Sequence, residues 1–283
     1  MAANSEQLGT AELLFRCAHE MGLRPTWISP NALFAVTVGG KERYVNCAQS
    51  STNSHLSSGL VKNKFMTRLI LHRQGMLNIP FARAYSHAEA EEFLLLHDKI
   101  IAKPIHGSGS KDIHIITTAS QLRELDITKY ILEKYIAGTE MRYLVLNDAV
   151  IAVHESEYGT SVDEHRPLQR FSYSEIEWDP VLIESSKQIA RIFGLKFTAI
   201  DYMIDETGKA YILEANSTPG LKWFHAPTSG PAVDVARLFL EDMIENTPTT
   251  TKQPGGFDTI RPKTPVRDYL SPPRNAVHRT FNL

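Results

Sequence analysis

The sequence lacks the features that mark membrane, secreted or nucleic-acid-binding proteins. No apolar run approaches the roughly 18 residues that a membrane-spanning helix requires, and the polar start MAANSEQLGT does not resemble a signal peptide. Lysine and arginine number 30 against 32 aspartate and glutamate residues, and no basic run is interleaved with aromatic residues. We therefore expect a cytoplasmic protein with no membrane association and no nucleic-acid partner.

Cysteine is also scarce, because the chain has only Cys17 and Cys47, and their separation matches no metal-binding spacing. We expect two reduced thiols of the core. The P-loop motif GxxxxGK[ST] and internal repeats are absent as well. What is present is a chain of 283 residues with 42% apolar residues, enough for one large or two medium domains.

The apolar periodicity predicts a mixture of helices and antiparallel strands. Helices are expected at 10–22, 63–75, 180–194 and 231–246, and hairpins about Gly39-Gly40, Asn147-Asp148 and Glu206–Lys209. Shorter strands are expected at 99–105, 112–117 and 130–136, while the polar stretch 49–59 is expected to be a loop. Adjacent hairpins and separate helices favour an α+β fold. Residues 247–283 are rich in Pro, Thr and Arg and are predicted to be disordered.

The stretch YILEANSTPG (211–220) begins as an apolar strand and ends with oxygen-bearing side chains. Glu214 and Asn216 lie on one face because side chains alternate along a strand. If Ile204 pairs with Tyr211 in the hairpin, Asp201 lies opposite Glu214, with Cβ atoms about 5 Å apart. Such carboxylates repel unless a cation lies between them, so the pattern predicts Mg²⁺ or Mn²⁺ at Asp201, Glu214 and Asn216. The alternative is that both acids are structural.

Two lysines and a small-residue loop are candidates for phosphate binding. Lys103 lies in the apolar strand IIAKP, where an ammonium group is costly unless it meets an anion. The loop HGSGSK (106–111) follows it, and its small residues allow backbone amides to approach phosphate oxygens. Lys64 begins the helix NKFMTRLIL. The alternatives are a solvated Lys64 and a plain turn at Gly107 and Gly109.

The ordered set of Lys64, Lys103 with its loop, ILEKYIAGTE and D…E-x-N resembles the ATP-grasp superfamily over about residues 60–246. The metal spacing followed by TPG is similar to that of D-alanine–D-alanine ligases. The stretch ILEKYIAGTEMRYLVL resembles the glutathione synthetase and cyanophycin synthetase branch, and so does the segment that leads into NKFMTRLIL. The resemblance implies two α+β subdomains whose antiparallel sheets hold ATP, at about 99–136 (lid) and 137–246 (metal-binding). A reduced N-terminal segment, 1–60, precedes them.

The resemblance also implies roles for individual residues. Lys64 and Lys103 would contact the nucleotide phosphates, and a lid would fold over them from Gly107, Ser108, Gly109 and Ser110. The adenine hinge would comprise Glu133, Lys134, Tyr135 and Ile136, with Ile131 beside it, and Glu140 would bind the ribose hydroxyls. Asp201, Glu214 and Asn216 would hold Mg²⁺ or Mn²⁺.

Arg142 lies two residues after Glu140, on the same predicted strand face. We expect it to stabilise charge on an acyl phosphate or tetrahedral intermediate, the alternative being a surface arginine. D-alanine ligases carry an arginine two residues before the first metal aspartate, where this chain has Ala199. The resemblance leaves further candidates open in or beside the linking segment 155–170 and after the metal strand. These are Arg166 and Arg170 for the γ-phosphate or the substrate, the flanking His154 and His165 as a second metal site or as solvated loop residues, and Lys222, Trp223 and His225 for the acceptor.

The resemblance implies a carboxylate–amine ligase that uses ATP and Mg²⁺ and joins small-molecule substrates, an amino acid or short peptide, through an acyl phosphate. Two alternatives remain open: ligation onto a protein or ribosomal peptide, and a nucleotide-binding regulatory protein without turnover. Because the N-terminal segment is short, another copy of the chain is expected to complete the substrate platform. The cyanophycin synthetases continue into a Mur-ligase-like domain, and nothing like it follows residue 246 here.

Overall fold

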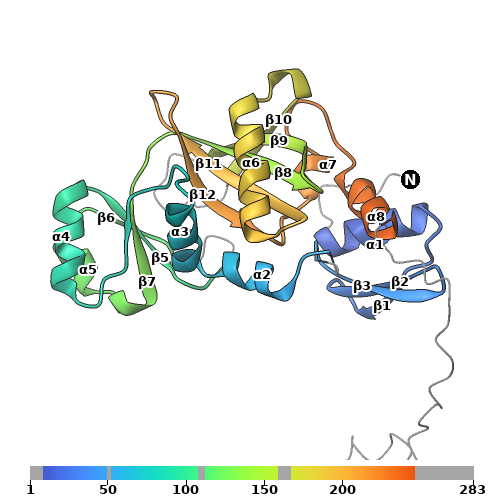
Figure 1. Ribbon diagram of the computed structural model, residues 1–283, viewed down its shortest axis with the longest axis horizontal. Coiled ribbons are helices and arrows are strands. Elements are labelled where there is room, and N and C mark those ends of the chain that lie inside the picture. Colours follow the sequence, from blue (N-terminus) through green and yellow to red (C-terminus); the bar gives the residue numbers. More distant parts are fainter. Residues whose placement is uncertain (1–8, 50–51, 108–111, 159–166, 246–283) are drawn as a thin grey trace, which may run out of the picture. The chain divides into compact units, whose positions relative to one another are not determined.

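The computed structural model describes residues 9–49, 52–107, 112–158 and 167–245, and all statements below concern these residues (Figure 1). The predicted residues Ser108, Gly109, Ser110, His165 and Arg166 and the predicted tail 247–283 lie outside them. No helix in the described part is both long enough and apolar enough to cross a membrane.

The N-terminal segment combines one helix with a small antiparallel sheet. Helix α1 is Thr10–Glu20, and the sheet has the order β1-β2-β3, with β1 Thr26–Ser29, β2 Leu33–Val38 and β3 Lys41–Asn46. The predicted hairpin about Gly39-Gly40 is confirmed as the β2–β3 connection. Leu14 of α1 and Phe34 of β2 are fully buried in one cluster with Phe197 and Phe239, so this segment shares a core with the C-terminal elements.

A four-stranded antiparallel sheet follows, with the order β4-β7-β5-β6. Its strands are β4 Phe81–Ala82, β5 Ile100–Pro104, β6 His114–Ile116 and β7 Tyr130–Lys134. Two helices pack on it, α4 His87–His97 on β7 and α5 Ala119–Arg123 on β6, and a 3-10 turn, η2 Ile127–Lys129, leads into β7. The expected strands within 99–105, 112–117 and 130–136 are confirmed.

A five-stranded antiparallel sheet has the order β10-β9-β8-β11-β12. Its strands are β8 Thr139–Leu146, β9 Ala149–Tyr158, β10 Pro167–Tyr173, β11 Phe197–Ile204 and β12 Ala210–Asn216. Both predicted hairpins, β8–β9 and β11–β12, are confirmed. Segment 155–170 is more than a connection between hairpins. Its first residues belong to β9 and its last residues to β10, and these two strands pair with each other.

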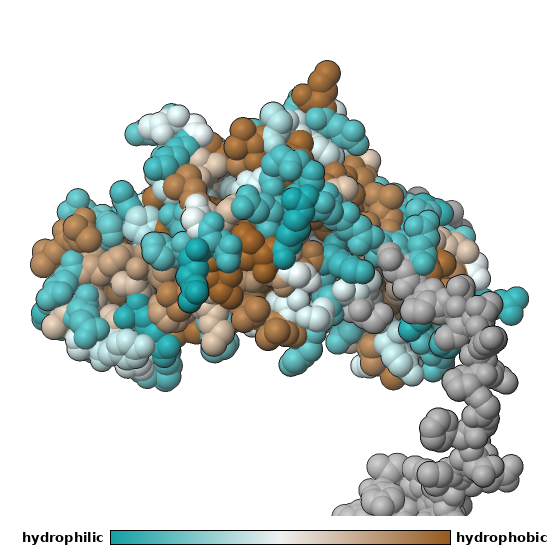
Figure 2. Space-filling view, viewed as in Figure 1, coloured by the Kyte–Doolittle hydropathy of each residue, from teal (hydrophilic) through white to brown (hydrophobic). Residues whose placement is uncertain are grey.

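The remaining helices cover this sheet or lead into it. They are α2 His55–Lys62, α3 Lys64–Arg73, α6 Pro180–Phe193, α7 Lys222–His225 and α8 Val235–Glu245, with the 3-10 turn η3 Glu175–Glu177 before α6. Helix α6 packs on β8, β9 and β11, and its outward side is largely hydrophilic (Figure 2). Helix α2 corrects the loop expected at 49–59, because the Ser54 hydroxyl accepts the Ser57 amide at 3.0 Å and starts a helix there.

Candidate active site

One face of the five-stranded sheet carries polar side chains across all its strands. Strand pairing places Glu214 opposite Asp201, Asp201 opposite Arg142, Arg142 opposite His154, and His154 opposite Ser172. Directly paired residues point to the same face of a sheet. The alternate positions of these strands point to the other face and pack under α6. The fold therefore brings the predicted metal residues and Arg142 into one row.

The pairing of Asp201 with Glu214 arises from a β-bulge. The register expected from the sequence, Ile204 with Tyr211, is wrong by one residue, because Ile204 pairs with Ala210. Leu213 is skipped between two successive pairs, and this bulge brings Glu214 opposite Asp201. The expected juxtaposition of the two acids is therefore confirmed, although the register from which it was inferred is not.

Arg142 forms a two-pronged ion pair with Asp201. Its Nε donates to Asp201 Oδ1 at 2.5 Å and its Nη2 to Oδ2 at 2.6 Å, with both side chains largely buried. Burial disfavours the charged guanidinium, but the Asp201 carboxylate more than offsets this and raises the pKa of Arg142. Arg142 is therefore a fixed cation in the centre of the row.

Glu214 resists ionisation in its place opposite Asp201. Burial, and then the charge of Asp201, raises the pKa of Glu214, while Arg142 and Lys64 act in the opposite direction. An added cation would relieve this repulsion. Asn216 lies two residues further along the same face, and its Oδ1 accepts the Thr218 amide at 2.9 Å.

These donors fit a hard divalent cation such as Mg²⁺, which takes carboxylate and amide oxygens and oxygens of a bound phosphate. Among the residues that the structure describes, no three His, Cys, Asp or Glu side chains gather around one point. A metal ion at Asp201 and Glu214 would therefore need the amide oxygen of Asn216 or ligands from a substrate.

Lys103 is held at the four-stranded sheet by a buried carboxylate. Its Nζ lies 2.7 Å from Glu133 Oε2, and Glu133 is 1% exposed. Burial alone would raise the pKa of Glu133, but Arg68 and Lys103 lower it to about 2. The Glu133 side chain thus binds Lys103, and only the backbone of Glu133 is available for the predicted contact with adenine.

Lys64 is the first residue of α3, as expected, and lies beside the predicted phosphate loop. Its Nζ donates to the Gly107 carbonyl at 2.9 Å, and its amide donates to the Ile105 carbonyl at 2.9 Å. Burial lowers the pKa of Lys64, and so does the charge of Lys103, while Glu214 opposes them. The two predicted lysines and Glu214 therefore lie within electrostatic range of one another.

The rest of the predicted hinge comprises the last residue of β7, Lys134, and the two residues that follow it. The amide of Lys134 donates to Pro80 O and that of Tyr135 to Lys99 O, whereas the Ile136 amide has no partner among the described residues. Glu140 accepts a hydrogen bond from the Ser156 hydroxyl at 3.2 Å.

The sequence alone leaves His154 open as a metal ligand or a solvated loop residue beside segment 155–170, and the structure shows that it is buried in a strand. His154 lies on β9, is 1% exposed and packs against the Phe224 ring with centroids 4.5 Å apart. Burial, and then the charges of Arg170 and Arg142, lower the pKa of His154 well below 6.5, so it is neutral. Arg170 is also buried, with Nη1 3.3 Å from His154 Nδ1. The two residues are buried on the face of the sheet that carries the polar row.

The residues expected to contact the acceptor, Lys222, Trp223 and His225, make contacts within the protein. His225 accepts the Ala236 amide at 3.0 Å, which caps the start of α8, while Lys222 lies over the Trp223 ring at 5.0 Å. Sequence reasoning missed Arg68, which is 2% exposed on α3. Its position one turn before the buried Leu71 indicates that it lies on the buried face of the helix. Its partners Glu133 and Ile212, however, lie far away in the sequence.

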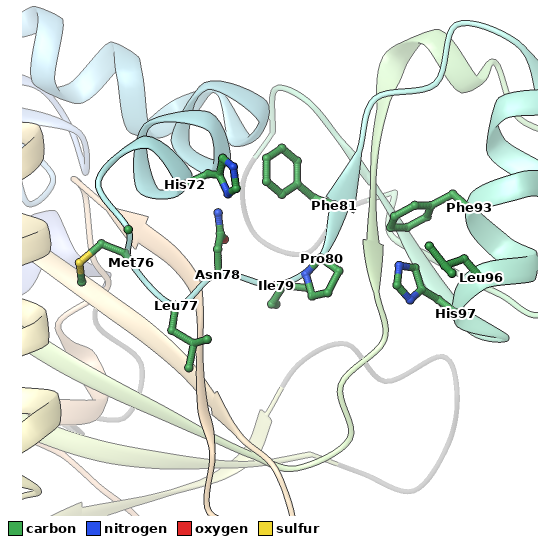
Figure 3. Close-up of a pocket in the computed structure, with 11 residues that line it drawn as sticks. His72, Met76, Leu77, Asn78, Ile79, Pro80, Phe81, Phe93, Leu96 and His97 are labelled. Atoms are coloured by element: carbon green, nitrogen blue, oxygen red, sulfur yellow. The ribbon is translucent and has the colours of Figure 1, made fainter.

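A cavity of about 690 Å³ lies elsewhere, between the segment after α3 and helix α4 (Figure 3). Pro80 and Phe81 border it on one side, and Phe93, Leu96 and His97 of α4 border it on the other. None of the predicted site residues lines it. The candidate active site is therefore the polar row with the two lysines, and not this apolar cavity.

Comparison with known proteins agrees with this geometry. The family described as ATP-grasp domain matches residues 61–220, more than half of the chain. The D-alanine–D-alanine ligase of Saccharophagus degradans is 24% identical over 190 residues, which cover 60% of this chain and 59% of that protein. The glutathione biosynthesis bifunctional protein GshAB of Listeria innocua is 32% identical over 128 residues, covering 41% of this chain and 16% of that one. This chain thus spans only part of the relatives it matches.

Solved structures show the same fold. A bifunctional glutathione synthetase from Pasteurella multocida superposes with a TM-score of 0.64 and 14% identity, covering 85% of this chain and 44% of that chain. The ATP-grasp ligase PsnB, solved with a minimal precursor, gives a TM-score of 0.57 and 18% identity over 69% of this chain and 62% of its own. The predicted α+β ATP-grasp fold is confirmed, and the chain belongs to the ATP-grasp domain family.

Proposed function

We propose that this chain is an ATP-dependent carboxylate–amine ligase that forms an amide bond and releases ADP and phosphate. The observation that carries the proposal is the convergence at Glu214. Strand pairing sets Asp201 opposite it, and Arg68 links the neighbouring Leu213 carbonyl to Glu133, which binds Lys103. Lys64 lies one turn before Arg68 on α3. Two carboxylates for a metal and two lysines for phosphates are what phosphoryl transfer from ATP requires, because positioning and charge neutralisation supply most of the catalysis.

The nucleotide would lie between the two sheets. Lys64 and Lys103 would bind its phosphate oxygens, and Asp201, Glu214 and Asn216 would hold Mg²⁺, which neutralises phosphate charge when bound. The Ile136 amide is the donor for adenine, since the neighbouring amides are already engaged. Glu140 would accept the ribose hydroxyls. Gly107 begins the loop that would cover the phosphates.

Arg142 would act in the second half of the reaction. It pairs with Asp201 in the polar row and remains protonated at any physiological pH, because the Asp201 carboxylate raises its pKa. A fixed guanidinium stabilises negative charge that develops on a phosphorylated carboxylate or on the tetrahedral intermediate formed by amine attack. Arg170, buried on the same face, provides a second positive charge.

The substrate class follows from the relatives and is part of the proposal. The similar proteins named as ligases join amino acids or build glutathione, which supports an amino acid or short peptide as substrate. PsnB is named in complex with a precursor peptide, and its similar fold supports a second candidate, ligation onto a peptide or protein. A partner subunit that completes the substrate platform remains part of the proposal.

The test is ADP release from Mg²⁺·ATP, screened against pairs of amino acids and short peptides. Glu214→Gln should reduce pair-dependent release at least about 100-fold, since it removes a charged ligand of the metal. Glu206→Gln, in the exposed turn of the same hairpin, is the matched control and should behave as wild type.

The outcomes separate the alternatives. Pair-dependent release that only Glu214→Gln loses establishes the ligase and identifies its substrates. ATP binding with release only in the presence of a peptide or protein acceptor favours the second candidate. Tight ATP binding without release for any acceptor contradicts the ligase and favours a nucleotide-binding regulatory protein.

A further inference from the structure

We propose that Arg68 is a positioning residue that aligns both halves of the nucleotide site at once. It touches neither the predicted phosphate position nor the metal position. Its guanidinium instead holds Glu133, which anchors Lys103, and the bulge of β12 that carries Glu214. The inference rests on the proposed function and adds a residue on which both the phosphate contacts and the metal contacts depend.

Arg68 lies on α3, one turn after Lys64, and is 2% exposed. Four hydrogen bonds leave its guanidinium: Nε to Glu133 Oε1 at 2.6 Å, Nη1 to Asn78 Oδ1 at 2.7 Å and to Ile212 O at 2.5 Å, and Nη2 to Leu213 O at 2.8 Å. A buried arginine with all three nitrogens engaged has a single orientation.

The bonds to β12 act on the bulge. Leu213 is the skipped residue whose presence sets Glu214 opposite Asp201, and Arg68 binds the carbonyls of Ile212 and Leu213. Strand β12 is at the edge of its sheet, so these carbonyls on its outer side need a donor from elsewhere. Arg68 supplies that donor and so fixes the conformation that presents the Glu214 carboxylate.

Asn78 completes this contact from the segment after α3. Its Nδ2 donates to the Arg68 carbonyl at 2.9 Å, and Asn78 forms a parallel bridge with Ile212. In Figure 3 the Asn78 amide points toward α3. The side chain therefore braces Arg68 at both its backbone and its guanidinium.

The bond to β7 acts on the phosphate lysine. One carboxylate oxygen of Glu133, Oε1, accepts a hydrogen bond from Arg68 Nε. The other, Oε2, lies 2.7 Å from Lys103 Nζ. Glu133 thus orients the ammonium of Lys103, and Arg68 orients Glu133. Partners that orient the primary ligands of a site typically affect affinity by about 10–100-fold when they are removed.

Lysine cannot replace this arginine fully. A guanidinium presents several donors in one plane, whereas an ammonium group is a compact point charge. Arg68→Lys should keep the charge opposite Glu133, but it cannot also satisfy the two β12 carbonyls. Arg68→Met should lose both the ion pair with Glu133 and the hydrogen bonds to the two β12 carbonyls. A purely structural role would lower stability without separating the binding of nucleotide from the binding of metal.

The experiment measures ADP binding without Mg²⁺, and then Mg²⁺ binding to the ADP complex, by calorimetry on the full chain. Arg68→Lys should keep the wild-type ADP affinity but weaken Mg²⁺ binding by about tenfold, whereas Arg68→Met should weaken both by about tenfold or more. Arg73→Met, an exposed arginine on the same helix, should change neither. Circular dichroism and melting temperature establish that the variants fold.

The inference is overturned if folded Arg68→Lys binds Mg²⁺ in the ADP complex as tightly as wild type does. If Arg68→Met does not fold, the lysine variant decides alone. A wild-type protein that binds ADP and Mg²⁺ but never turns over would refute the proposed ligation without affecting this test. A wild-type protein that binds no ADP would overturn both proposals.

Discussion

Arg142 and Asp201 face each other across two paired strands and share two hydrogen bonds, at 2.5 and 2.6 Å. Without a metal ion, Arg142 is the cation that allows Asp201 and Glu214 to lie opposite each other in a largely buried place. If Mg²⁺ binds these acids as proposed, it would take over part of that neutralisation and leave the arginine available to substrate. The stability of the protein should then be sensitive to Mg²⁺.

Replacing Arg142 should therefore destabilise the protein in a way that Mg²⁺ partly reverses. Arg142→Met leaves a buried carboxylate without its partner, which typically costs about 3–5 kcal/mol. Urea unfolding with and without millimolar MgCl₂ measures the loss and its recovery, because a ligand that binds only the folded state adds stability. Arg191→Met breaks an exposed pair with Asp148 and should cost less than about 1 kcal/mol in either buffer. Equal losses in the two variants would contradict the expectation.

His154 should make the protein less stable in mild acid. Its folded pKa lies well below 6.5 because of burial and the neighbouring arginines, so between these values the unfolded chain binds a proton that the folded chain does not. Stability is then complete above pH 6.5 and falls below it, by up to about 1.4 kcal/mol per pH unit. His154→Gln cannot titrate and should show a shallower decline between pH 7.5 and 5.5 in urea unfolding. Parallel declines of the two proteins would refute this role.

Gly138 is expected to tolerate no side chain. A Cβ at this position would lie 2.0 Å from the carbonyl oxygen of Ile204, a backbone atom that cannot move without separating β8 from β11. Gly138→Ala should lower the free energy of unfolding by about 3 kcal/mol. Gly59→Ala is the matched control, because it lies inside α2 with open space around it, and should raise stability by about 1 kcal/mol. A neutral Gly138→Ala variant would show that the strands can separate there.

The two cysteines should differ in reactivity. Cys17 is buried, and burial, followed by the charge of Asp234, raises the pKa of its thiol to about 11. Cys47 is half-buried, and both thiols are free. Because the thiolate is the reactive form, iodoacetamide at pH 8 should label Cys47 in the native protein and Cys17 only after unfolding. Peptide mass spectrometry reads both sites, and equal native rates would contradict the expectation.

Much of the fold could be predicted because it is encoded locally. The hairpins about Asn147-Asp148 and at 206–209, and the helix that Lys64 begins, follow from alternation and turn residues within short stretches. The elements that were missed have polar sequences or edge positions. Helix α2 begins in a serine-rich stretch with a weak apolar pattern, and β10 is the edge strand of its sheet and pairs with β9 alone.

The candidate site was predictable where strand alternation sufficed. It placed Glu214 and Asn216 on one face, and the hairpin brought Asp201 to them. The register itself was not predictable, because the Leu213 carbonyl at the bulge accepts a hydrogen bond from the guanidinium of Arg68, which is 145 residues away in the sequence.

By itself the sequence determined which chemical groups are available: an acid and an amide at the end of one strand, a second acid on its hairpin partner, lysines at a helix start and in an apolar strand, and the order that matches ATP-grasp proteins. The tertiary structure decided which charges meet. Arg68 reaches Glu133 across 65 residues, and Arg142 reaches Asp201 across 59. Periodicity reports which face a side chain occupies, but only packing between distant strands decides which buried charge neutralises which.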